Sequence, residues 1–353
     1  MPAISMRNVT PSISLSESWI FRIILGCFFL SGVTGLMYEV VWSRLLGLVF
    51  GNTVYAISIV LAAFMGGLAL GSYLGGRWAD RLRRPLFAYG LLEVGIGAYG
   101  LLSPFLLEGV GNVYQIVAGA WVFPHPGAYL IRFLLAILVL FFPTFLMGVT
   151  FPLLSRRFVP RVDMVGHRVG WLYALNTWGA VVGAFSAGFL LFPTVGLVWT
   201  IRMAAIINFI IGLIAFLLER TTSPAEFSTR PVTTPESFQP LPKDVQLILV
   251  AFALSGFTSF LYEVAWTRIL KLEFGATTLA ISTVLTVFMG GLALGAYLAG
   301  KRADRLHTPL FFYGIIEIVI AIYVLIGSFI FPWALTYFSK ITILFADSFW
   351  VLS

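Results

Sequence analysis

The sequence predicts an all-α polytopic membrane protein, a bundle of nine transmembrane helices arranged as two parallel repeats of six and three helices. The first observation is composition: 59% of the 353 residues are hydrophobic, 10% are charged, and the mean hydropathy is +0.97. No soluble core could bury that much apolar surface. The second is an internal duplication. Residues 32–99 align without a gap on residues 256–323, and roughly 40 of those 68 positions are identical.

Nine apolar runs of about 20 residues each are long enough to cross a bilayer. They fall at residues 22–45, 53–75, 86–107, 128–154, 169–192, 197–218, 245–268, 277–299 and 309–332. We therefore divide the chain into a cytoplasmic N-terminal segment (1–21), a first six-helix repeat (22–218), a Pro-rich cytoplasmic linker (219–244) and a second repeat (245–353). The prolines, serines and threonines between the repeats are typical of a solvated linker.

The charge of the loops predicts the orientation of the chain. Six spans separate equivalent points of the two copies, so the repeats must be parallel. Arginines cluster after the second, fourth and eighth spans, whereas the loop 108–127 contains neither Lys nor Arg. Positive-inside logic places the N-terminus and the even-numbered loops in the cytoplasm, with the chain in a plasma or inner membrane. The net charge of +7 then reflects these loops. The sequence has no stripe of alternating basic and aromatic residues, so nucleic acid is not a predicted partner.

The second repeat is predicted to stop after its third helix. With the offset of 224 residues, Ser353 aligns with Tyr129, where the fourth span begins. The sequence is then either a fragment or a degenerate nine-span form, and the logic of the repeat favours the fragment.

Two glutamates lie at equivalent positions within the first and seventh spans. Glu39 and Glu263 are costly in hydrocarbon unless they are paired or face water, so an intramembrane acid is by default a candidate functional group. An alternative is a structural ion pair near the headgroups with Arg44 or Arg268, beside Trp42 and Trp266 as interfacial belt residues.

A second equivalent pair, Glu93 and Glu317, lies in the third and ninth spans, about two turns from the cytoplasmic loop. A short acidic side chain cannot easily reach water from that depth, so we expect either a cavity-facing or a helix-bridging role. All four glutamates are hypothetical substrate-binding residues, able to attract cations or to exchange protons.

Small residues follow one stripe of the second span at four-residue spacing. Gly67, Gly71 and Gly75 are matched in the second copy by Gly291 and Gly295. Such stripes let two helices approach closely in lipid, so a packing role is predicted.

The following cytoplasmic loop contains Asp80-Arg81, repeated as Asp304-Arg305. It resembles the G-x-x-x-D-R-x-G-R signature of major facilitator transporters, although Arg83 and His307 replace the later glycine. The alternatives are a gating role and a simple positive-inside anchor.

The sequence contains no recognisable catalytic residues. It lacks a phosphate-binding loop, a nucleophile elbow and a zinc-protease motif, and its three histidines are scattered over loops. Cys27, the single cysteine, lies in an apolar span. We therefore predict no metal, no cofactor and no intrachain disulfide.

Several motifs taken together resemble one family more specifically. They are Y-E-x-x-W-[ST]-R, F-M-G-G-L-A-L-G-x-Y, Pro143-Thr144 through Met147-Gly148-x-Thr150-x-Pro152, and Leu175-Asn176-Thr177-x-Gly179-Ala180. They look like the membrane part of fused major facilitator and spermidine synthase proteins. In that family a polytopic domain precedes a soluble Rossmann domain of aminopropyltransferase type, which binds decarboxylated S-adenosylmethionine.

The resemblance implies two alternative functions. The chain could be a transporter-like module that moves a small solute, with polyamines among the candidates. Alternatively, it could be a membrane anchor that docks a cytosolic aminopropyltransferase-like domain. No residue here can perform aminopropyl transfer, so a synthase label would come by similarity only. Apart from such a domain and the unknown solute, the lipid bilayer is the predicted partner.

Overall fold

The computed structural model describes residues 17–51, 54–119, 126–158, 165–221, 242–274, 278–303 and 305–345. These ranges are helical apart from short connections and contain no strand, so the all-α class is confirmed. The helices are α1 (Glu17–Phe50), α2 (Val54–Ala79), α3 (Pro85–Gly119), α4 (Pro126–Phe158), α5 (Val165–Phe185), the π-helix η2 (Ser186–Leu191), α6 (Phe192–Thr221), α7 (Lys243–Phe274), α8 (Thr278–Ala303) and α9 (Pro309–Phe345).

Eight apolar segments of the described chain are long enough to cross a membrane, and one of them accounts for two crossings. Arg168–Thr221 has 54 residues, more than twice the length that one crossing needs. It contains α5, η2 and α6, and Gly196 interrupts it with φ 79° and ψ 176°, a conformation essentially restricted to glycine. Counted as two, this segment brings the helices of membrane-crossing length in the described residues to nine.

Helix boundaries follow local chemistry. Pro85, Pro126 and Pro309 occupy the first helical position of α3, α4 and α9, where a missing N–H removes no hydrogen bond. Gly51, with φ 85°, follows the last residue of α1 and ends that helix. Helix α9 continues to Phe345, beyond the apolar run that we predicted to end at 332. The proposed linker lies mostly outside the described residues.

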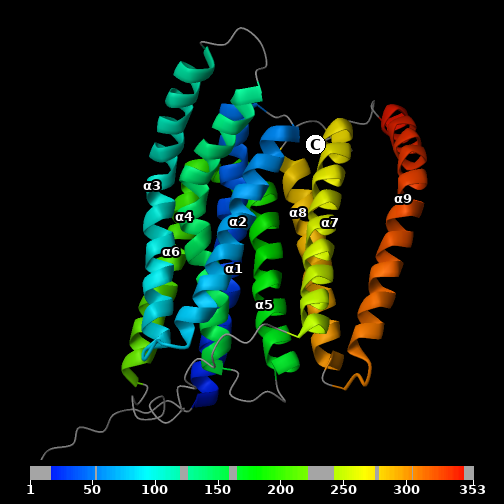
Figure 1. Ribbon diagram of the computed structural model, residues 1–353. Helices are drawn as coiled ribbons and strands as arrows, with labels where there is room; N and C mark the ends of the chain where they lie inside the picture. The colour runs from blue at the N-terminus through cyan, green and yellow to red at the C-terminus, as the bar shows by residue number, and fades with distance from the viewer. Residues whose placement is uncertain are drawn as a thin grey trace, which may run out of the picture.

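The first six helices form one bundle, and α7, α8 and α9 lie beside it (Figure 1). Within the bundle α2 packs on α4, α1 on α5 and α6, and α3 on α4 and α6. The two repeats meet chiefly through α5 and α8. There the Trp171 and Tyr297 rings lie edge to face at 5.4 Å, and Gly170 approaches the backbone of Gly300. Helix α9 contacts α7 lightly.

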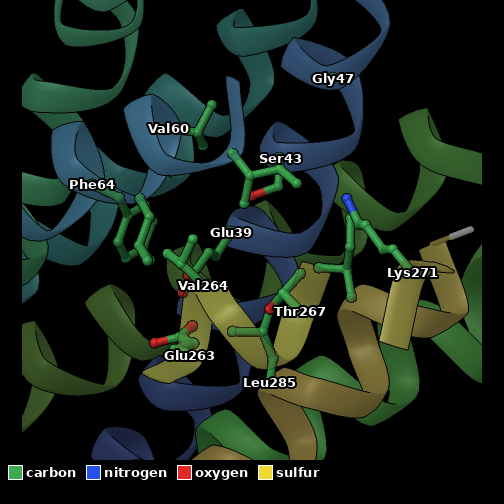
Figure 2. Close-up of a pocket in the computed structure, with 13 residues that line it drawn as sticks. Glu39, Ser43, Gly47, Val60, Phe64, Glu263, Val264, Thr267, Lys271 and Leu285 are labelled. Atoms are coloured by element: carbon green, nitrogen blue, oxygen red, sulfur yellow. The ribbon is translucent and has the colours of Figure 1, made fainter. Parts of the chain in front are cut away.

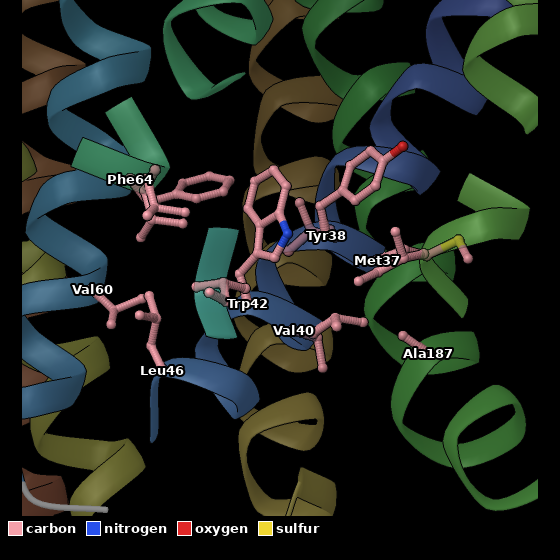
Figure 3. Packing of buried hydrophobic residues seen from close by; sticks show 14 of the residues in the cluster. Met37, Tyr38, Val40, Trp42, Leu46, Val60, Phe64 and Ala187 are labelled. Carbon is pink, nitrogen blue, oxygen red and sulfur yellow. The ribbon is translucent and has the colours of Figure 1, made fainter. Parts of the chain in front are cut away.

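The aromatic side chains of Tyr38, Trp42 and Phe64 lie among aliphatic ones in the core of the first bundle (Figure 3). Trp42 is fully buried, stacks on Tyr38 at 5.0 Å and donates a hydrogen bond from Nε1 to Ser103 Oγ at 2.9 Å. The interpretation of Trp42 as an interfacial belt residue is therefore wrong, because its indole N–H is satisfied inside the protein rather than by headgroups. Trp266 repeats the arrangement, half-buried between Tyr262 and Tyr323.

Candidate functional site

A cavity lies between the two repeats, enclosed by α1, α2, α7 and α8 (Figure 2). Glu39, Ser43 and Gly47 of α1 line it at four-residue spacing, which places them on one face of the helix. Its volume is about 40 Å³, enough for a few water molecules. A solute of several carbon atoms could enter only if the repeats moved apart.

Two carboxylates face this cavity from opposite repeats. Glu39 and Glu263 are each 3% exposed. Within the described part of the chain, Oε2 of each has no hydrogen-bond partner, and neither residue pairs with Arg44 or Arg268. Because a buried charged group without a partner is strongly unfavourable, two such oxygens on one cavity would gain from a bound cation or a shared proton.

The walls of the cavity repeat the duplication of the sequence. With the 224-residue offset Glu39 matches Glu263, and Ser43 matches Thr267. Part of the apolar wall follows the same rule, with Ile57 matching Ile281 and Leu61 matching Leu285. Parallel repeats of this kind are related by an axis along the membrane normal, and coupling sites lie at the repeat interface. The cavity is therefore a site built from both copies.

Glu93 lies elsewhere, inside the first bundle, where it is fully buried. Ser31 Oγ donates to its Oε1 at 2.7 Å, and Asn208 Nδ2 donates to its Oε2 at 2.6 Å. Tyr38 donates to Asn208 Oδ1 at 3.0 Å, and the Asn208 amide also reaches Thr34 Oγ1 at 3.2 Å. This network joins α1, α3 and α6, so the geometry of Glu93 is that of a helix bridge.

Glu317 repeats half of that network. Ser255 Oγ donates to Glu317 Oε1 at 2.6 Å, joining α7 to α9 as Ser31 and Glu93 join α1 to α3. The structure thus brings two of the four candidate glutamates to the cavity and places the other two in serine contacts between helices.

The glycine stripe of α2 packs on α4. A side chain at Gly67 would meet Thr144, one at Gly71 would meet the Phe145 carbonyl, and one at Gly75 would meet Val149. Ser72 Oγ donates to the Gly148 carbonyl in the same contact at 3.0 Å. On α8, by contrast, no described atom lies within 4 Å of a Cβ built at Gly291 or Gly295.

The loop after α2 carries an ion pair. Asp80 Oδ1 lies 2.8 Å from Nε of Arg156, near the C-terminal end of α4, with side chains 65% and 39% exposed. Arg81 N–H donates to the Trp78 carbonyl, and Arg305 N–H donates to the Arg302 carbonyl, so the same turn occurs in both repeats. Asp304 lies outside the described residues.

Two residues of these sites were not predicted from the sequence. Asn208 was overlooked because a single amide in an apolar helix carries no motif. Lys271, which lines the cavity, was not predicted because it departs from the repeat, on which the site prediction was based. A search for positions where the copies differ in charge would have found it, since Lys271 aligns with Gly47.

The apolar segments of membrane-crossing length in the described part of the chain define a multi-pass integral membrane protein. The sequence pattern of the Major Facilitator Superfamily matches residues 23–352. The chain therefore belongs to the Major Facilitator Superfamily.

Two curated proteins of Streptomyces coelicolor are also similar to part of the chain. Polyamine aminopropyltransferase 2 is 31% identical over 193 residues, which cover 54% of this chain and 33% of that protein. Polyamine aminopropyltransferase 1 is 26% identical over 204 residues, covering 57% and 35%. The chain thus matches about a third of the length of these relatives. No solved structure gives a significant match.

Proposed function

We propose that this chain is a transporter-like membrane module that binds a small cationic solute between its repeats, with Glu39 and Glu263 as the binding carboxylates. The observation that carries the proposal is that two buried carboxylates at equivalent positions face one cavity, and that one oxygen of each has no partner among the described residues. Ammonium groups are suitable ligands, because they bring both charge and hydrogen-bond donors.

Polyamines are the first solutes to test. The two relatives are named as polyamine aminopropyltransferases, and a diamine could give one ammonium to each carboxylate. The cavity of about 40 Å³ is too small for such a molecule. Binding therefore requires the repeats to separate, as in alternating access, where one half rocks against the other around a fixed site.

Uptake of radiolabelled putrescine into proteoliposomes tests this proposal. Glu39→Gln and Glu263→Gln keep the size of the side chain and remove its charge, so we expect each to lower uptake at least tenfold. Glu108→Gln is the matched control, because Glu108 is exposed on α3 away from the cavity. Uptake that is the same in all three variants and the wild type would refute the role of the two glutamates.

A membrane anchor for an aminopropyltransferase-like domain is the second candidate. The observation that favours it is the partial match, since the relatives are named as enzymes and the chain covers about a third of each. Reading the coding DNA beyond the Ser353 codon tests this candidate. A frame that continues into a Gly-rich soluble domain would support an anchor, whereas a stop codon would count against one in the same polypeptide.

For the orientation, we propose that the N-terminus and the Arg-rich loops lie in the cytoplasm. Cys27 is the only cysteine, so a Cys27→Ser background allows a single reporter thiol. A cysteine introduced at Arg84 should be protected from impermeant maleimide in intact cells, and one at Glu108 should be labelled. The reverse pattern would invert the proposed topology.

A further inference from the structure

Lys271 breaks the symmetry of the cavity. It aligns with Gly47, so one repeat places a cationic side chain where the other has none. The remaining equivalent pairs on the cavity wall keep their chemistry, as a carboxylate pair, a hydroxyl pair and two aliphatic pairs. Among these five equivalent pairs, only Gly47 and Lys271 differ in chemistry. Val60, Phe64 and Val264 also line the cavity without an equivalent residue in its wall, but all three are apolar.

This lysine lies at the opposite end of the cavity from the acids. It is in the last turn of α7, eight residues beyond Glu263, which corresponds to about 12 Å along the helix axis. Figure 2 shows its nitrogen directed toward α1.

The amine at one end of the cavity does not pair with the acids at the other. Among the residues that the structure describes, Lys271 makes no ion pair with Glu39 or Glu263. The lining thus carries two carboxylates at one end and one amine at the other, with the Ser43 and Thr267 hydroxyls and apolar side chains between them. In a site of low polarity such separated charges favour a ligand with the complementary arrangement.

We infer that the solute is amphoteric, an amine that also carries a carboxylate, and that Lys271 binds this carboxylate while Glu39 and Glu263 bind the ammonium group farthest from it. A dibasic amino acid fits the charges, since its net charge of about +1 complements a lining of two negative groups and one positive group. A simple diamine would leave Lys271 unpaired beside additional positive charge. This inference rests on the proposed cation site.

Ornithine and putrescine form a matched pair of probes, because they differ by one carboxylate. We would measure equilibrium binding of each radiolabelled compound to the purified full chain. The wild type should bind ornithine at least tenfold more tightly than putrescine. Lys271→Met should weaken ornithine binding about tenfold and strengthen putrescine binding, whereas Lys271→Arg should preserve the preference. Arg268→Met is the control, since Arg268 is exposed on α7 and does not line the cavity.

Each contrary result has a distinct meaning. Equal or tighter binding of putrescine by the wild type would overturn the inference while leaving the cation site intact, and this comparison needs no variant to fold. Ornithine binding that is unchanged by Lys271→Met would also overturn it. If neither probe binds the wild type more tightly than a Glu39→Gln/Glu263→Gln double variant, the proposed cation site fails and the inference fails with it.

Discussion

Replacing Glu93 by alanine should destabilise the protein far more than the same change at its repeat equivalent, Glu317. Glu93 accepts two hydrogen bonds from other helices, at 2.7 Å from Ser31 and 2.6 Å from Asn208, and is fully buried. Glu317 accepts one, at 2.6 Å from Ser255, and is half-buried. The two positions share sequence context and chemistry, so the comparison isolates the network around Asn208.

The expected loss in free energy of unfolding follows from the hydrogen bonds that Glu93→Ala removes. Interhelical hydrogen bonds in membrane proteins contribute about 0.6 kcal/mol on average and about 1.7 kcal/mol at most. Two of them give about 1–3 kcal/mol, and the buried Asn208 amide that loses its acceptor adds about 1 kcal/mol. We therefore expect Glu93→Ala to lower the free energy of unfolding by about 2–4 kcal/mol and Glu317→Ala by less than about 1 kcal/mol.

Equilibrium unfolding in mixed detergent micelles, with an increasing fraction of sodium dodecyl sulfate and helicity as the readout, measures both changes. Glu93→Gln keeps one acceptor and should lie between the wild type and Glu93→Ala. Equal losses at Glu93 and Glu317, or a loss below about 0.5 kcal/mol at Glu93, would refute the reasoning, since the network would then contribute less than one average bond.

Two further predictions use the same measurement. Gly71→Val should lower the free energy of unfolding by about 1–3 kcal/mol, because its Cβ would meet the Phe145 carbonyl. Gly295 has no described neighbour within 4 Å of such a Cβ, so Gly295→Val should lower it by less than about 0.5 kcal/mol. Similar losses at the two glycines would contradict the packing argument. Asp80→Asn removes an exposed ion pair with Arg156 and should change the unfolding free energy by less than about 1 kcal/mol. If the loop gates transport, putrescine uptake by Asp80→Asn will nevertheless fall severalfold, and unchanged uptake would leave the loop as an anchor.

The different surroundings of Glu39 and Glu93 could not be predicted from the sequence alone. Glu39 and Glu93 are both glutamates within apolar helices, and the cost of burying a carboxylate singled out both. Periodicity places a residue on one face of its helix but does not say which neighbour that face meets. The difference between them depends on Asn208, which is 115 residues from Glu93 in the chain. The Ser31 and Ser255 contacts, by contrast, could have been predicted from the repeat, since both serines and both glutamates occur in the two copies.

The sequence by itself determined the all-α class, the nine apolar crossings and the duplication, because hydrocarbon requires each crossing segment to satisfy its own backbone hydrogen bonds and a helix does so locally. Tertiary structure decided which side chains meet. It placed Glu39 and Glu263 on one cavity, enclosed Glu93 in a network and set Lys271 opposite the acids. These outcomes depend on how helices far apart in the chain rotate and pack against one another, and side-chain packing between helices is not encoded in any single segment.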